Sequence, residues 1–418
     1  MNLSTIKTTS VLILKWVLIC ALIGFFSGSA SAFLLVALEW AAATRENNSW
    51  IIWLLPIAGF IIGLSYHYYG VIAVRGNNLL LEEYEKPVAK IPFRMAPLVL
   101  FGTIGTHLFG GSAGREGTAV QMGAAIADQF TSFFNLDKPD RKTIIILGIS
   151  AGFASVFGTP LAGAIFALEV LYFSKISLKS TALSFLVAYF AYYTVAIWKV
   201  HHTHYAIPFV PDFSLIVLAW IIPSSILFGL AAMLFSRSTH FWGASFASYI
   251  KYAPLRPFLG GIVIALVVYI IGTTKFIGLG VPVIVDAFSN PSGQFDFLWK
   301  ILLTGFTLGA GFKGGEVTPL FFIGATLGSA LSLVIPLPIA FLAGLGFVAV
   351  FSGATHTPVA CTVMGMELFG TEAAVYIAFA CFIAYLASGS VGIYHAQIVK
   401  GPKYHLYQKL KRKKASSL

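Results

Sequence analysis

Residues 110–117 read Gly-Gly-Ser-Ala-Gly-Arg-Glu-Gly, and residues 309–316 read Gly-Ala-Gly-Phe-Lys-Gly-Gly-Glu. Each stretch interrupts apolar sequence and is too rich in glycine for a helix interior, where each glycine costs about 1 kcal/mol relative to alanine. A better helix-forming segment follows each stretch. We therefore predict two broken helices, each with one glutamate, Glu116 or Glu316, beside the break.

The two glycine-rich stretches belong to a longer internal repeat. At an offset of 200 residues, seven of the 21 positions from 105 to 125 are identical, and they include the two glutamates. At an offset of 198, a second block pairs two Thr-Pro dipeptides and aligns Glu169 with Glu367. Small residues recur in any packed helical membrane protein, but paired glutamates and prolines are harder to explain in that way. The pattern predicts two related membrane halves, residues 1–210 and 211–399, followed by a basic tail, residues 400–418.

The composition places most of this chain in lipid. Of the 418 residues, 58% are hydrophobic and only 10% are charged, whereas soluble domains have about 25% charged residues. Several apolar stretches approach the roughly 20 residues that a spanning helix needs, and shorter ones are expected to stop inside the membrane. None shows the alternation of barrel strands. We expect an all-α integral membrane protein with spans near residues 16–38, 50–72, 215–235, 259–271 and 373–387.

The charges near the two ends predict the orientation in the membrane. Lys7 and Lys15 precede an apolar run that passes through a signal-peptide-like segment at residues 29–32 without stopping, so we read it as a first spanning helix. Seven Lys or Arg residues lie between Lys400 and Lys414, and no acidic residue follows Glu372. This positive-inside pattern places both termini in the cytoplasm. It explains the net charge of +11 without a nucleic-acid partner.

The two glutamates are candidate functional groups because a carboxylate at membrane depth is costly unless it is paired or protonated. Duplicated transporters often use inverted repeats, whose broken helices point their N-termini at an anion near the midplane. A carboxylate at such an N-terminus takes the place of the anion, and it leaves when protonated. This arrangement would exchange protons for anions. The alternative is a local ion pair of Arg115 with Glu116, although adjacent helical residues do not face each other.

The motifs around these residues resemble those of the CLC anion channels and transporters. GREGTAV at residues 114–120 is similar to the family signature, in which the glutamate is the gating and proton-carrying residue. GGEVTP at residues 314–319 resembles the second anion-binding segment of the family, and Ile393-Tyr394 resembles its pore tyrosine. The resemblance implies inverted-repeat subunits with broken, tilted helices that form homodimers. It assigns supporting roles to Gly114, Arg115, Gly117, Thr118, Gly314, Gly315 and Pro319.

Four departures from the chloride-transporting pattern resemble the fluoride-exporting branch, CLC-F. Asn77 replaces a serine, at a position where the branch often has methionine, and Thr118 replaces a proline. Glu169 is followed by Val170 instead of a second inner acid. Glu316 stands where chloride transporters have no acid. The resemblance implies that fluoride leaves the cytoplasm in exchange for inward protons, with no cofactor and no metal. It implies anion binding by Asn77, Glu316, Val317, Thr318 and Tyr394, and gating by Glu116.

Several alternatives remain open at this stage. A chloride channel or a chloride/proton antiporter would share the fold and the gate. An intramembrane serine hydrolase would use one of two G-x-S-x-G patterns, at residues 110–114 and 148–152, with His107 or His356 as base, but that motif belongs on a strand-to-helix turn. His201, His202 and His204 are expected to be loop residues and not metal ligands. We expect a multi-pass protein of the cell membrane.

Overall fold

The computed structural model describes residues 3–171, 177–397 and 403, and every regular element in these ranges is a helix. This confirms the predicted fold class. Of the predicted basic tail, only Lys403 lies within the described residues. The boundary between two halves at residue 210 remains a prediction, as does the boundary of the tail.

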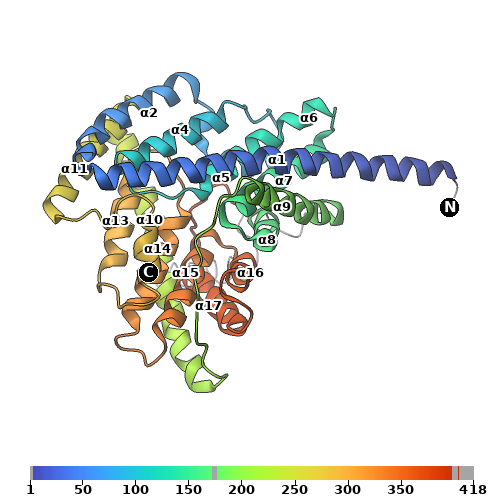
Figure 1. Cartoon of the computed structure of the whole chain (residues 1–418). Helices are drawn as coiled ribbons and strands as arrows, with labels where there is room; N and C mark the ends of the chain where they lie inside the picture. Colours follow the sequence, from blue (N-terminus) through green and yellow to red (C-terminus); the bar gives the residue numbers. More distant parts are fainter. Residues whose placement is uncertain (1–2, 172–176, 398–402, 404–418) are drawn as a thin grey trace, which may run out of the picture.

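The N-terminal part of the chain begins with one long helix, α1, which runs across the whole molecule in Figure 1. Asp137 caps α7, because its side chain accepts a hydrogen bond of 2.8 Å from the Asp140 N–H. Gly158 ends α7 in the left-handed conformation. The elements up to residue 197 are α1 (Leu3–Asn47), η1 (Ser49–Leu54), α2 (Leu55–Tyr69), η2 (Ala73–Arg75), α3 (Asn77–Glu85), α4 (Met95–Leu108), α5 (Glu116–Ala127), α6 (Gln129–Phe133), α7 (Lys138–Phe157), α8 (Pro160–Val170) and α9 (Leu178–Ile197).

The C-terminal part begins after an extended connection, at Ser214, whose side chain accepts a hydrogen bond from the Val217 N–H and so caps α10. Several of its helices form the lower part of the molecule in Figure 1. The elements are α10 (Leu215–Tyr249), α11 (Leu255–Ile271), α12 (Val281–Asp286), α13 (Asp296–Gly309), α14 (Val317–Leu331), α15 (Ile339–Thr355), α16 (Pro358–Phe369) and α17 (Ala374–Ala387).

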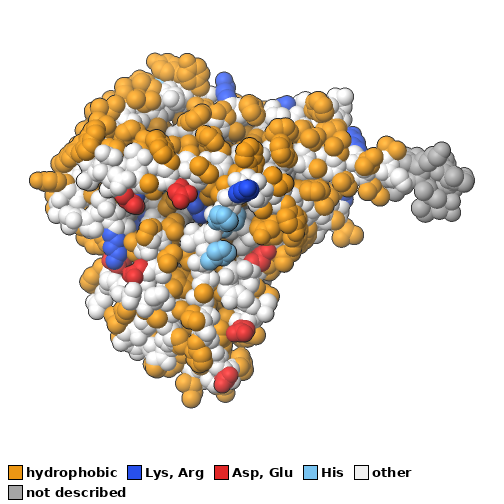
Figure 2. Space-filling view, viewed as in Figure 1, with side chains coloured by type: hydrophobic (Ala, Val, Ile, Leu, Met, Phe, Trp, Pro, Cys, Tyr) orange, Lys and Arg blue, Asp and Glu red, His pale blue; other side chains and the backbone are white. Residues whose placement is uncertain are grey.

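Within the part of the chain that the structure describes, four helical segments are long and apolar enough to cross a membrane: Ser10–Asn47, Ser49–Tyr69, Leu178–Ile197 and Leu215–Tyr249. Other apolar helices, including α4, α8 and α14, have only 10–17 residues, as predicted for helices that stop inside the membrane. The stretch predicted at 50–72 begins with a 3-10 helix and ends earlier, at Tyr69. Hydrophobic side chains cover much of the visible face in Figure 2, which suits a surface solvated by lipid.

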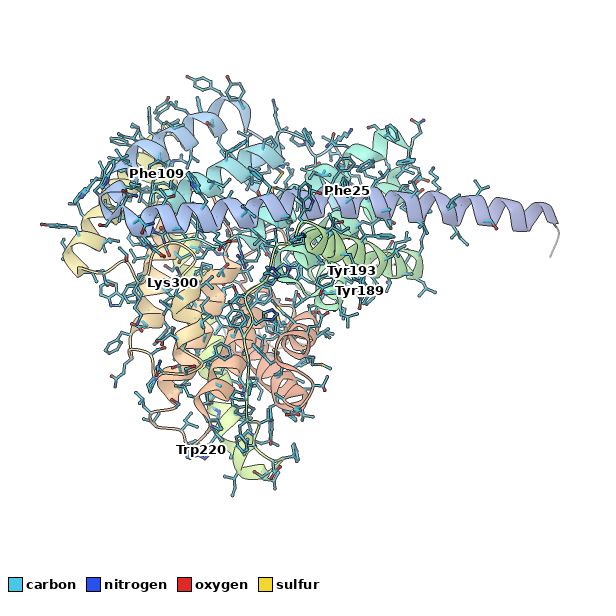
Figure 3. The ribbon with its side chains drawn as sticks, viewed as in Figure 1. Phe25, Phe109, Tyr189, Tyr193, Trp220 and Lys300 are labelled. Carbon is cyan, nitrogen blue, oxygen red and sulfur yellow. The ribbon has the colours of Figure 1, made fainter. Side chains whose placement is uncertain are left out.

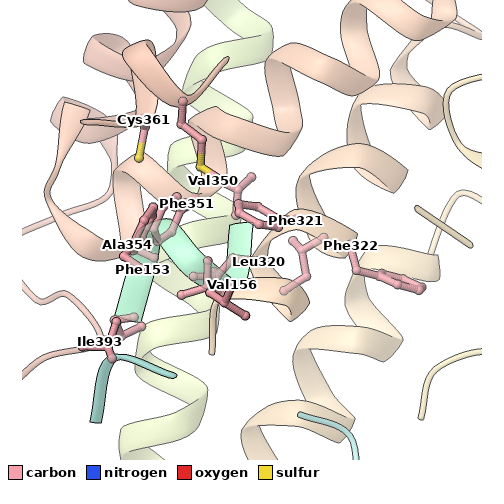
Figure 4. Packing of buried hydrophobic residues seen from close by; sticks show 14 of the residues in the cluster. Phe153, Val156, Leu320, Phe321, Phe322, Val350, Phe351, Ala354, Cys361 and Ile393 are labelled. Carbon is pink, nitrogen blue, oxygen red and sulfur yellow. The ribbon is translucent and has the colours of Figure 1, made fainter. Parts of the chain in front are cut away.

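Glycines let two pairs of helices approach until their backbones touch. A Cβ atom on Gly123 of α5 would lie 2.3 Å from the Gly148 carbonyl oxygen of α7, and one on Gly324 of α14 would lie 2.0 Å from that of Gly346 in α15. Small residues at such crossings allow close helix packing in membranes. Aromatic rings fill the space between the two parts of the chain, as Figure 4 shows for Phe153, Phe321 and Phe351.

Glu169 and Glu367 connect the two parts of the chain reciprocally. The Glu169 carboxylate, at the end of α8, accepts hydrogen bonds of 3.0 and 2.7 Å from the first N–H groups of α16, those of Val359 and Ala360. The Glu367 carboxylate, near the end of α16, accepts bonds of 2.9 and 2.7 Å from the N–H groups of residues 161 and 162 at the start of α8. Each helix therefore receives a charged cap from the other.

Candidate functional site

The two glycine-rich segments meet at the centre of the site. Gly114 and Gly315 form an antiparallel bridge in which each N–H donates to the other carbonyl oxygen, at 2.6 and 2.7 Å. A Cβ atom on Gly114 would lie 2.9 Å from the Gly315 oxygen and 2.8 Å from Cδ of Pro319. Glycine is therefore required by the close approach of the two backbones. The bridge brings the starts of α5 and α14 together.

Glu116 is the first residue of α5, but its carboxylate lies at the N-terminus of α14 instead of its own helix. The Thr318 N–H donates to Oε2 at 2.9 Å, and the Thr318 hydroxyl donates to Oε1. The Arg115 N–H also donates to Oε2, at 3.1 Å. The side chain is buried, and hydrogen bonds to a charged group are worth about 1.5–3 kcal/mol each. The carboxylate thus takes the position in which a helix N-terminus would hold an anion.

The ion pair of Arg115 with Glu116, which the sequence left as an alternative, is present only as a long contact. Nε of Arg115 lies 3.7 Å from Oε1 of Glu116 and makes no hydrogen bond. Both groups that hold the carboxylate from α14 belong to Thr318. The position of the Glu116 side chain is therefore determined mainly by the first turn of α14.

Glu316 immediately precedes the first residue of α14. Its Oε2 would lie 3.4 Å from a Cβ atom on Gly117, and Nδ2 of Asn77 would lie 3.0 Å from the same point. The side chains of Asn77 and Glu316 therefore both lie next to Gly117, on the side where its Cβ atom would be. Negative charges on Glu316 and Glu116 repel each other, and a charge on Glu316 also opposes ionisation of Tyr394. The site thus gathers two carboxylates, one amide and one phenol.

Asn77 and Tyr394 line one small cavity of about 10 Å³, together with Val170 of α8. Asn77 is the first residue of α3, and its Oδ1 atom is buried without a hydrogen-bond partner among the described residues. Tyr394 lies in the segment after α17 and is buried. These two residues, 317 positions apart, were both predicted as anion ligands, and the fold brings them together. Val170 supplies an apolar wall to the same cavity.

A second cavity of about 20 Å³ lies beside Glu116, on the side of the connection between α9 and α10. Arg115, His202 and Tyr205 contribute polar groups to its wall, and Phe321 and Phe347 contribute apolar ones. This volume holds one water molecule, which has about the size of a fluoride ion. His202 was expected to be a loop residue, and it is, but sequence reasoning did not place it at the site. Among the described residues, no three His, Cys, Asp or Glu side chains lie where they could hold a metal ion together.

Buried polar contacts hold the segment before Glu116. The Ser112 hydroxyl donates to the Phe276 carbonyl at 2.9 Å, and the Gly278 N–H donates to the Gly111 carbonyl at 3.0 Å. Lys300, labelled in Figure 3, is fully buried and donates to the carbonyls of Phe276 and Gly278 at 3.2 and 2.8 Å. These contacts fix the backbone that presents Arg115 and Glu116. They were not predicted, because none of them follows a local sequence pattern.

The remaining motif residues support the backbone. Val317 is buried at the start of α14, and Gly314 has a positive φ of 155°. The Thr118 hydroxyl pairs with that of Thr103 at 2.7 Å, and so it faces α4 and not the carboxylates. Thr118 was predicted only as a supporting residue, and it lies where a packing role would place it.

The arrangement for a serine hydrolase is not formed. Ser112 is fully buried and bonded to Phe276 and Thr304, and Ser150 donates to the Ser184 carbonyl. The ring nitrogens of His107 contact the carbonyl oxygens of Thr103 and Ala113 at 2.8 and 3.0 Å, and neither contacts a serine. No nucleophile and base are within reach of one another at these motifs.

The described geometry, with two broken helices facing each other across a buried carboxylate, agrees with comparisons to known proteins. A model of the voltage gated chloride channel family matches residues 58–389. The chain belongs to this family. Its members are ion transporters and channels, not enzymes, and this chain has the CLC fold. A crystal structure of a CLC-type fluoride/proton antiporter superposes with a TM-score of 0.90 at 33% identity, over 93% of this chain and 98% of that one.

Other CLC relatives differ in the ion that their names give. The chloride/fluoride channel protein of Pseudomonas syringae pv. tomato is 50% identical over 94% of this chain and 88% of its own length. The H(+)/Cl(-) exchange transporter ClcA of Vibrio campbellii is 24% identical over 83% of this chain and 80% of its own length. The predicted family is therefore confirmed, and the more similar of these two CLC proteins is the one whose name includes fluoride.

Proposed function

We propose that this CLC protein is a fluoride/proton antiporter, which exports fluoride from the cytoplasm in exchange for inward protons. The observation that carries the proposal is the contact of the Glu116 carboxylate with the N–H and hydroxyl of Thr318. An anion and this carboxylate cannot accept hydrogen bonds from the N–H and hydroxyl of Thr318 at the same time. The structural similarity to a fluoride/proton antiporter supports fluoride as the anion.

Proton binding to Glu116 supplies the coupling. A protonated carboxyl group loses the charge that the N-terminus of α14 stabilises, and its hydrogen bonds become weaker. The side chain then leaves, and fluoride takes its place on Thr318. When the proton is released on the other side, the carboxylate returns and displaces the anion. Each cycle therefore moves fluoride and protons in opposite directions.

The candidate anion ligands suit a small, strongly hydrated ion. Thr318, Tyr394 and Asn77 offer compact donors, and Val317 contributes to the first turn of α14. Glu316 lies beside them and, in its protonated form, donates a hydrogen bond to fluoride. In its ionised form it repels anions. We infer that Glu316 selects fluoride, because fluoride is a stronger hydrogen-bond acceptor than chloride.

A chloride/proton antiporter or a chloride channel of the same fold is the second candidate, and two of the names above favour it. One relative is named a channel protein and another an H(+)/Cl(-) exchange transporter. The acid at Glu316 and the apolar Val170 beside Asn77 and Tyr394 argue for the fluoride antiporter. We further propose a homodimer in the cell membrane, with both termini in the cytoplasm.

The proposal is tested in proteoliposomes that contain the purified protein and either fluoride or chloride, with ion efflux and pH recorded together. We expect fluoride efflux with simultaneous proton uptake, and chloride efflux at least tenfold slower. Chloride efflux as fast as fluoride efflux would favour the second candidate. Fluoride efflux without proton uptake would identify a channel.

A further inference from the structure

His356 occupies a backbone position for which the first half of the repeat uses glycine. Gly158 ends α7 with φ 74° and ψ 22°, and His356 ends α15 with φ 57° and ψ 40°. Both precede a Thr-Pro pair, and they are 198 positions apart. Glycine adopts this left-handed conformation without steric cost, whereas histidine does not. The second half therefore tolerates strain in order to place an imidazole here.

The imidazole of His356 is buried, and neither ring nitrogen has a hydrogen-bond partner among the described residues. Burying two unpaired polar atoms is unfavourable, and such groups in a folded protein call for an explanation. The ring packs edge to face against Tyr385, but this contact gives neither nitrogen a hydrogen-bond partner. An imidazole with both nitrogens free can accept a proton at one of them and release a proton from the other.

The ring lies against the segment that carries Tyr394. A Cβ atom on Gly392 would lie 3.5 Å from Nδ1 of His356, and the Ile393 N–H donates to the Ala354 carbonyl at 2.9 Å. Nε2 of Gln397 donates to the carbonyl of Thr355, the residue before His356, at 2.9 Å. The imidazole thus lies against the backbone two residues before Tyr394, which itself lines the cavity shared with Asn77.

The charged and titratable groups that face His356 come from three elements. The Tyr385 ring of α17 lies 5.7 Å away, edge to face. The Nζ atom of Lys403 lies 4.2 Å from the centre of the same ring, and its positive charge opposes a positive charge on His356. Glu169 of α8 interacts with Tyr385. Val170, which stands where a second acid is absent, lines the same cavity as Tyr394.

We propose that His356 is a proton-binding residue of the transport cycle, which passes protons between the pore at Tyr394 and the side of the membrane on which the C-terminal segment lies. The assignment rests on the proposed antiport. The imidazole takes a proton that Glu116 has carried into the pore, becomes an imidazolium, and releases a proton from its other nitrogen to water. No net charge stays on the residue after one passage.

The test uses His356→Gly, which relieves the backbone strain, and His356→Asn, which adopts the same conformation but carries no proton. Fluoride efflux and proton uptake are recorded together in proteoliposomes across pH 5–8. We expect both variants to elute as the wild type does in size-exclusion chromatography, and proton uptake to fall at least tenfold. The pH dependence of the remaining fluoride efflux should flatten. His67→Asn, at an exposed histidine of α2, should change nothing.

Each other outcome overturns the proposal. If His356→Gly couples protons to fluoride with the wild-type rate and pH profile, His356 has no part in proton transfer. If neither variant folds, the residue has a structural role instead. If the wild type releases fluoride without protons, the proposed antiport fails, and the role of His356 fails with it.

Discussion

The carboxylate of Glu116 accepts two hydrogen bonds from Thr318, a residue 202 positions later in the chain. One comes from a backbone N–H, which only proline would remove, and the other comes from a hydroxyl, which many substitutions remove. This relationship explains why a broken helix in one half of the chain needs a broken helix in the other. It also means that a substitution of Thr318 alone can weaken the binding of the Glu116 carboxylate at this position.

Removing the Thr318 hydroxyl should loosen the gate. Thr318→Val keeps the shape of the side chain but removes a bond to a charged group worth about 1.5–3 kcal/mol, and every 1.4 kcal/mol corresponds to a factor of about ten. We expect the number of protons taken up per fluoride to fall at least tenfold in proteoliposomes. Thr318→Ser, which retains the hydroxyl, should stay close to the wild type. An unchanged proton-to-fluoride ratio in Thr318→Val would show that the hydroxyl does not hold the gate.

A side chain at Gly117 should block the site. A Cβ atom there would lie 3.0 Å from Nδ2 of Asn77 and 3.1 Å from Cα of Gly315, so either the amide or the bridge must move. We expect Gly117→Ala to reduce fluoride efflux more than tenfold. Gly243→Ala is the matched control, because a Cβ atom on Gly243 would meet nothing within 4 Å. Equal efflux from the two variants would contradict the described packing.

We predict that the reciprocal caps formed by Glu169 and Glu367 contribute to the stability of the fold and have no direct role in ion transport. In Glu169→Gln or Glu367→Gln, an amide NH₂ would face one of the two helix N–H donors, and losing such a bond costs about 1–3 kcal/mol. We expect both variants to unfold at lower temperature in detergent, by similar amounts, with the proton-to-fluoride ratio unchanged. Glu46→Gln, at an exposed carboxylate, should unfold like the wild type. A large difference between the two cap variants would argue against a reciprocal role.

His202 should make the protein less stable in acid. It lies in the connection between α9 and α10, where burial, aided by the charge of Arg115, lowers its pKa to about 4. Because the unfolded chain binds this proton near pH 6.5, the stabilising effect of a neutral His202 is complete above that pH and is lost as the pH falls towards 4. We expect the unfolding temperature to drop less between pH 7 and pH 5 in His202→Gln than in the wild type. Equal drops would show that His202 does not titrate in this way.

The sequence predicts the architecture well, because lipid leaves few choices for the backbone. Glycine-rich breaks, apolar stretches and the repeat offsets indicate the helices and the position of both glutamates. They do not indicate that the Glu116 carboxylate accepts hydrogen bonds from α14 in the second part of the chain. The N–H and hydroxyl of Thr318 that donate these bonds are not marked by any local sequence pattern. His202 and Lys300 were missed for the same reason: long-range packing, and no local pattern, brings them to the site. The equivalence of Glu116 and Glu316 suggested by the repeat also breaks down, because only Glu116 contacts α14 through Thr318.

The most direct test of the central claim, that a proton and an anion compete for the N-terminus of α14, is the simultaneous recording of fluoride efflux and pH for Glu116→Gln and the wild type in the same liposome preparation. The glutamine cannot bind a proton and cannot present a charge to Thr318. Fluoride efflux from the variant without proton uptake, beside coupled transport by the wild type, is the predicted result. Proton uptake by Glu116→Gln at the wild-type ratio would contradict the account.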